Sequence, residues 1–208
     1  MPKQNNQLKH SNQAVVFDYD GTLIDSRRVK VRNYRDAVET VFSPPESMRT
    51  DIEESCLRTM GANRFVQLED TLRVLGMSAS RQQRENWSLL YSALNRRTIP
   101  SVAEFPSVRR LLSGLEEAGY ALFAASGILE AEFLQELAKR GFSRFFLEAK
   151  GGDKEAFLRS LKDRGFAPIL FVGDTIYDQR TAEKVGVSFF RIDTEEDVRK
   201  LESRLLPT

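Results

Sequence analysis

The chain is poor in the two side chains that most often bind zinc or form nucleophile–base pairs. Its 208 residues include one cysteine, Cys56, and one histidine, His10. A lone histidine in a polar N-terminal segment argues against Ser-His-Asp hydrolysis and against most zinc sites. A single cysteine cannot form an internal disulfide, which agrees with a reducing compartment. We therefore interpret Cys56 as a packed residue without a catalytic role.

Long apolar runs and an excess of charge are also missing. No stretch approaches the roughly 18 apolar residues that suggest a membrane span, and the N-terminus MPKQNNQLKHSNQ lacks the apolar core of a signal peptide. The 31 basic residues nearly balance the 30 acidic ones, so nothing favours nucleic acid or an anionic membrane as a partner. We expect a cytoplasmic protein, either a monomer or a weak homodimer, without membrane or nucleic-acid partners.

Strand and helix patterns alternate over the second half of the chain. Expected strands cover 120–125, 145–147, 169–172 and 188–192, and expected helices cover 107–118, 129–140, 154–164, 178–185 and 195–205. The apolar run Val15–Phe17 adds a first strand. This alternation predicts an α/β fold with a doubly wound parallel sheet of about five strands.

Residues 27–104 differ from the rest because they contain helical patterns alone. Helices are expected at 27–42, 51–60, 64–75 (after Asn63 as a cap) and 80–97. This pattern predicts an all-α domain inserted after the first strand. The expected organisation is a core domain of 14–26 and 105–208, a helical cap domain of 27–104, and a flexible tail of 1–13.

The segment Val15–Ser26 reads VVFDYDGTLIDS and carries the strongest functional signal. Asp18 and Asp20 follow a buried strand, at the carboxyl end where open α/β sheets bind ligands. Two carboxylates this close repel unless a cation or a shared proton intervenes, and Mg²⁺ suits oxygen ligands. Gly21 allows a sharp turn, and Thr22 offers a hydroxyl and an amide to an anion.

The string DYDGTLID resembles the first motif, DxDGTL, of the haloacid dehalogenase-like superfamily. Three more segments resemble the other family motifs in order: Ser126-Gly127 after an apolar run, Lys154 in GGDKEAFL, and GDTIYD with Asp174 and Asp178. Together they cover residues 14–192. The chain is thus similar to the phosphatase branch with a helical C1 cap, which includes phosphoglycolate phosphatases and beta-phosphoglucomutases.

The resemblance assigns roles to the acidic residues. It implies that Asp18 is the nucleophile and Asp20 the general acid/base of an aspartyl-phosphate mechanism. Mg²⁺ would be held by Asp18, Asp174 and the backbone carbonyl of Asp20. Asp178 is better placed to hold metal-bound water or to orient Lys154 than to bind the metal directly.

The remaining motif residues would handle the phosphate. Lys154 would neutralise the transferred group and lower the pKa of Asp18. Ser126 and the amides of Gly21 and Gly127 would donate hydrogen bonds to its oxygens. These assignments imply a Mg²⁺-dependent phosphatase acting on a small phosphorylated metabolite.

Several alternatives stay open at this point. Lys150 could take the place of Lys154, and Ser126 could serve as a helix N-cap. A sugar-phosphate mutase shares all four motifs, and a catalytically idle binding or regulatory protein could share the fold. Asp20 argues against a dehalogenase, which needs no proton for its leaving group. Lysine is absent between Lys30 and Lys139, which argues against phosphonate cleavage by a cap lysine.

The expected cap is slightly basic, with 13 basic and 10 acidic residues in 27–104. Arginines usually mark a solvated helix face, but some of these could bind a second anionic group on the substrate. The candidates are Arg27, Arg28, Arg32, Arg49, Arg58 and Arg64.

Overall fold

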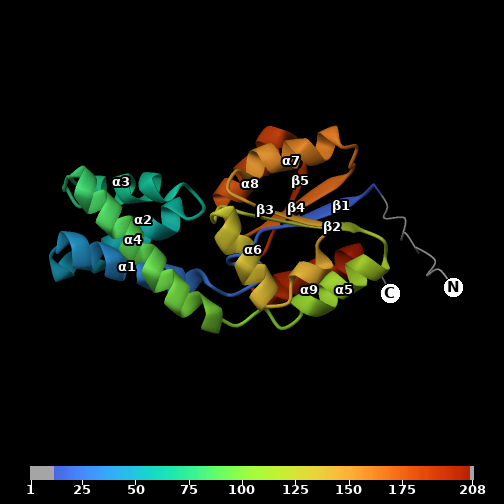
Figure 1. The fold of residues 1–208 in the computed structure, drawn as a ribbon, viewed down its shortest axis with the longest axis horizontal. Coiled ribbons are helices and arrows are strands. Elements are labelled where there is room, and N and C mark those ends of the chain that lie inside the picture. The colour runs from blue at the N-terminus through green and yellow to red at the C-terminus, as the bar shows by residue number, and fades with distance from the viewer. Residues whose placement is uncertain (1–11, 207–208) are drawn as a thin grey trace. The chain divides into compact units, whose positions relative to one another are not determined.

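The computed structural model describes residues 12–206 (Figure 1). Contacts divide the chain into two compact units. The core unit comprises the described part of Met1–Leu23 together with Phe105–Asp174 and Asp178–Thr208. The helical unit comprises Ile24–Glu104 and the short segment Thr175–Tyr177. The observed helical unit thus starts three residues before the boundary expected from the sequence.

A five-stranded parallel sheet forms the centre of the core unit, in the order β3-β2-β1-β4-β5. The strands are β1 (Ala14–Phe17), β2 (Ala121–Ser126), β3 (Glu148–Gly151), β4 (Ile169–Gly173) and β5 (Ser188–Arg191). Every residue of β1 and β2 is buried, as expected for strands covered on both faces. The predicted α/β fold with a doubly wound sheet is confirmed.

Helices cover both faces of this sheet (Figure 1). They are α5 (Val108–Glu117), α6 (Glu130–Lys139), α7 (Lys154–Asp163), α8 (Ile176–Val185) and α9 (Glu195–Leu205). Residues of α7 and α8, such as Leu161 and Ala182, pack with Val16, Phe123 and Phe171 in one apolar cluster. Each large side chain buried in this way contributes roughly 1.5–3 kcal/mol. This packing holds the strand ends, and therefore the loops that follow them, in fixed positions.

One predicted strand is wrong. Residues 145–147 are not a strand, because Ser143–Phe145 forms a 3₁₀ turn and β3 begins only at Glu148. The apolar run is used for packing: Phe145 is buried, and the ring of Phe146 lies 6.4 Å from that of Phe17. The observed strand is charged because β3 lies at a sheet edge, where charged residues discourage pairing with other chains.

The other predicted elements agree with the structure to within two residues at each end. The predicted tail is only partly described, and His10 lies outside the described residues. The last two residues of this segment, Asn12 and Gln13, are hydrogen-bonded to the core unit. The carbonyls of Asn12 and Gln13 accept hydrogen bonds from the amides of Ala167 (2.8 Å) and Ala121 (2.9 Å).

The helical unit contains α1 (Arg27–Phe42), α2 (Arg49–Thr59), α3 (Arg64–Val74) and α4 (Arg81–Thr98), with 3₁₀ turns at Glu46–Met48 and Ile99–Ser101. Asn63 caps α3 as predicted, since its side chain accepts from the Phe65 amide at 2.9 Å. Cys56 is packed in the apolar core, as predicted, and burial raises the pKa of its thiol to about 12. Within residues 12–206, no helix combines the length and apolarity of a transmembrane span.

Candidate active site

The carboxyl ends of three neighbouring strands carry the predicted site. Asp18 directly follows β1, Ser126 ends β2, and Asp174 directly follows β4. Since β1 lies between β2 and β4, their carboxyl ends meet, and the strand order reverses beside β1. Such a switch point is where open α/β sheets bind ligands. All three side chains are nearly inaccessible to solvent.

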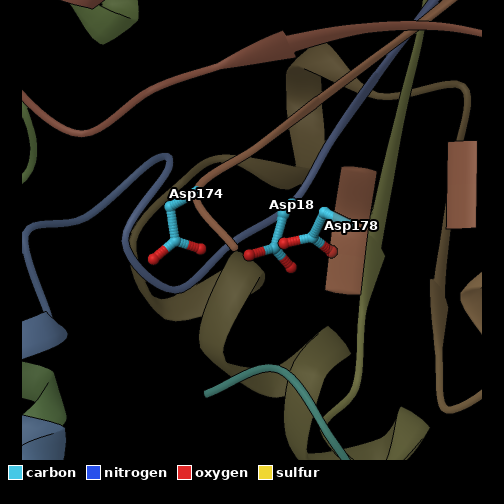
Figure 2. Close-up of side chains that lie close together, drawn as sticks. All are labelled: Asp18, Asp174 and Asp178. Carbon is cyan, nitrogen blue, oxygen red and sulfur yellow. The ribbon is translucent and has the colours of Figure 1, made fainter. Parts of the chain in front are cut away.

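Three carboxylates gather at this position (Figure 2). Asp18, Asp174 and Asp178 each offer an oxygen, and these oxygens lie within 4.8 Å of one another. Asp178 joins them from the first turn of α8. Three buried carboxylates repel one another strongly, and their hard oxygen donors match a divalent cation such as Mg²⁺. The carboxylate of Asp20 is not part of this cluster. Binding of a metal ion by the backbone carbonyl of Asp20 stays a prediction.

Lys154 bridges two of these carboxylates. Its Nζ lies 2.7 Å from Asp18 Oδ1 and 2.7 Å from Asp178 Oδ1. The lysine is the first residue of α7, and Asp153 caps that helix by accepting the Ala156 amide at 3.0 Å. The cap fixes where the helix begins and so directs Lys154 toward the strand ends.

The alternative lysine lies elsewhere. Lys150 Nζ pairs with Glu130 at 2.6 Å, and the two side chains are 47% and 44% exposed. The structure therefore brings Lys154, and not Lys150, to Asp18.

Burial dominates the electrostatics of the site. It raises the pKa of Asp18 to about 8, because the lowering by Lys154 is outweighed by burial together with Asp178 and Asp174. Lys154 therefore lowers the pKa of Asp18 as expected, but not enough to hold it below its ordinary value. Although burial opposes it, the carboxylates of Asp178 and Asp18 raise the pKa of Lys154. Further positive charge beside Asp18 would lower its pKa and favour the ionised carboxylate.

Two glycines make room for the acidic residues. Gly21 has a φ of +81°, and a Cβ there would lie 2.6 Å from Asp174 Cγ. A Cβ on Gly173 would lie 2.7 Å from the Cβ of Asp178. The importance of Gly173 was not predicted from the sequence, although its position directly before Asp174 could have indicated it. Gly21 therefore allows loop backbone to pack against Asp174, and Gly173 allows the end of β4 to pack against Asp178.

The predicted phosphate-binding residues differ in what they can offer. Ser126 is not the N-cap of α6, since that helix begins at Glu130 with Leu129 as its cap residue. Its hydroxyl accepts the Ile128 amide at 3.3 Å and keeps its own proton for another acceptor. Gly127 is exposed.

Thr22 is less accessible to a bound anion than predicted. Its side chain is fully buried, and its amide donates to the Tyr19 carbonyl at 3.4 Å. The hydroxyl finds no hydrogen-bond partner within residues 12–206. Contact between Thr22 and a substrate stays a prediction.

Half of the candidate arginines are held within the helical unit. Arg49 pairs with Glu39 at 2.9 Å and Arg58 with Asp70 at 2.5 Å, and Arg64 donates to Ser92 at 2.6 Å. These contacts agree with a structural role on the surface of the unit. The predicted contact of a cap arginine with a second substrate anion stays a prediction.

One known family matches most of the chain. The family described as haloacid dehalogenase-like hydrolase matches residues 15–192. A phosphoglycolate phosphatase of Mesorhizobium japonicum is 26% identical over 206 residues, which cover 92% of this chain and 88% of the relative.

Solved structures share the fold. A predicted phosphoglycolate phosphatase from Haemophilus somnus superposes with a TM-score of 0.71 at 20% identity, covering 86% of this chain and 84% of the other. A haloacid dehalogenase-like hydrolase from Streptococcus pneumoniae superposes with a TM-score of 0.64 at 18% identity, covering 90% of each chain.

Proposed function

Because the chain belongs to the haloacid dehalogenase-like hydrolase family, we propose that it is a Mg²⁺-dependent phosphatase of small phosphorylated metabolites. The observation that carries this proposal is the buried group formed by Asp18, Lys154 and Asp178, with Asp174 beside it. The similarity of this chain to a phosphoglycolate phosphatase favours a small phosphorylated carboxylic acid as its substrate.

Asp18 and Asp20 divide the chemistry. The Asp18 carboxylate attacks phosphorus, the bond from phosphorus to the ester oxygen breaks, and Asp20 protonates the leaving alkoxide. Asp20 then takes a proton from the water that attacks the aspartyl phosphate. The bond between phosphorus and Asp18 breaks, and inorganic phosphate leaves.

The surrounding residues remove the repulsion between an anionic nucleophile and an anionic substrate. Lys154 places its charge next to Asp18, where the phosphoryl group must bind. Ser126 and the amides of Gly21 and Gly127 donate to the phosphoryl oxygens. Asp18, Asp174 and the Asp20 carbonyl would hold Mg²⁺, which would supply additional positive charge, while Asp178 holds Lys154 in place.

The test is phosphate release by the purified protein. Phosphoglycolate and a panel of other phosphorylated metabolites are assayed with Mg²⁺ and with excess chelator, beside Asp18→Asn as the inactive control. We expect metal-dependent release that is fastest with small phosphorylated acids. Phosphate transfer between sugar phosphates without release would indicate a mutase instead. Absence of both reactions with every substrate would contradict the proposal and favour a binding protein.

A further inference from the structure

The end of strand β3 lies beside Ser126, the last residue of β2, and beside the loop that follows it. Gly151 lies opposite Ser126 in the parallel pairing of β2 with β3. The amide of the next residue, Gly152, donates to the Ser126 carbonyl at 2.8 Å. The backbone position of Ser126 is therefore fixed from the β3 side.

Gly151 also touches the other end of this loop. A Cβ on Gly151 would lie 2.6 Å from the Glu130 amide nitrogen and 2.6 Å from the Ile128 carbonyl oxygen. Ordinary contacts of a Cβ begin near 3.4 Å. Since the facing atoms belong to backbone, no side chain can rotate away to relieve the overlap. Gly151 does not have a positive φ, so the position requires space and not unusual backbone geometry.

The contact is coupled to the Ser126 hydroxyl. The Ile128 amide donates to Ser126 Oγ at 3.3 Å, and Ile128 is one of the residues that Gly151 touches. A shift of Ile128 would therefore change the direction of the Ser126 hydroxyl. The neighbouring Lys150–Glu130 ion pair is exposed, and exposed ion pairs contribute little to stability, so it cannot substitute for this packing.

We propose that Gly151 is a positioning residue for phosphate binding, because its missing side chain sets the distance between β3 and residues 127–130, which form the loop after β2 and the start of α6. This inference rests on the proposed function of Ser126 and Gly127. An added methyl group would push the loop outward by roughly 1 Å, and a displacement of that size can cost on the order of 100-fold in rate. The loop can yield in this way because Leu129 and Glu130 are exposed.

The experiment compares Gly151→Ala and Gly151→Val with two controls. Lys150→Met removes the adjacent ion pair only. Gly141→Ala places a methyl group in open space at the end of α6, where a φ of +70° strains it without contact to the loop. The measured quantities are KM, kcat, the Kd of inorganic phosphate by calorimetry, the activation constant of Mg²⁺, and Tm.

We expect Gly151→Ala to raise KM and the phosphate Kd by at least about 10-fold, and Gly151→Val to raise them further. The activation constant of Mg²⁺ should change by less than about 2-fold, because none of the three carboxylates lies on β3 or on this loop. Gly141→Ala should lower Tm without changing KM. In a Ser126→Ala background, Gly151→Ala should raise KM and the phosphate Kd by a much smaller factor, because the hydroxyl through which Gly151 acts is gone.

Unchanged KM and phosphate Kd in folded Gly151→Ala would overturn the proposal. It would also be overturned if the alanine variant could not be obtained folded, or if its activity fell only in proportion to its unfolded fraction. Phosphate calorimetry needs no turnover. A wild-type protein that binds phosphate but hydrolyses no substrate would therefore contradict the proposed function and leave the role of Gly151 measurable.

Discussion

The ammonium group of Lys154 lies 2.7 Å from a carboxylate oxygen of Asp18. Asp18 follows β1, the central strand of the sheet. Lys154 is the first residue of α7, a helix that covers one face of the sheet. Both side chains are largely buried, so the pair excludes most solvent and its interaction is screened weakly. The second carboxylate on Lys154, from Asp178, holds the lysine in place.

Replacing Lys154 by methionine should lower kcat by at least about 100-fold, because a developing phosphoryl charge loses its nearest cation. Lys150→Met is the matched control, since that lysine contacts Glu130 on the surface. Its kcat should stay within about 2-fold of wild type. Steady-state kinetics on both variants check this prediction, and an equal loss in the two would contradict the assignment of Lys154.

Asp18→Asn should reduce kcat by a factor of about 1,000 or more, because an amide is a poor nucleophile. The protein should stay folded, since the change removes one of three mutually repelling carboxylates. Circular dichroism and Tm establish folding. A folded variant that keeps more than about a tenth of wild-type activity would show that no covalent intermediate forms at Asp18.

Asp20→Asn should slow alkyl phosphates more than aryl phosphates. An alkoxide needs a proton in order to leave, whereas a nitrophenolate leaves without one. The measurement is the ratio of kcat/KM for the two substrate types in wild type and variant. If both fall by the same factor, Asp20 is not the general acid.

Asp70 in the helical unit should make stability depend on pH. Burial alone would raise the pKa of Asp70, but hydrogen bonds from Arg58, Arg73 and Ser55 lower it below the ordinary 3.8. A lowered folded-state pKa contributes stability that is present above about pH 4 and is lost as the pH falls through the folded value. Asp70→Asn should therefore cost about 1–2 kcal/mol at pH 7, and this difference should shrink below pH 4.

Urea unfolding of wild type and Asp70→Asn at several pH values measures this effect. Glu85→Gln is a suitable control, because the Arg81–Glu85 pair lies on the surface of α4 and should contribute little. A difference that stays constant from pH 7 to below pH 4 would show that the Asp70 charge does not stabilise the unit.

Local patterns were enough to predict most of the fold. Strands buried on both faces must be apolar throughout, so β1, β2 and β4 stand out as continuous runs. Helix ends were equally clear where a residue has a local task. Asn63 caps α3, and glycines that follow helices, such as Gly119 and Gly165, have positive φ values. Only the structure gives the order of the strands in the sheet.

Local patterns misled where packing used the residues differently. The run Phe145-Phe146-Leu147 resembles a buried strand, but Phe145 and Phe146 fill space beside the sheet. The edge strand that follows carries Glu148 and Lys150, which no apolar pattern would reveal. Edge strands lack one neighbour, so their composition reports exposure and not membership of the sheet.

The sequence by itself determined which residue types stand at the strand ends, and thus the motif carboxylates of Asp18, Asp174 and Asp178. Only the tertiary structure decided that Lys154, and not Lys150, lies beside Asp18. The raised pKa of Asp18 and the close packing at Gly151 and Gly173 also come from the tertiary structure alone. These properties depend on distances between segments far apart in the chain and on how much water the packed core excludes. Spacing along a sequence carries neither quantity, because both arise only when the strands and helices come together.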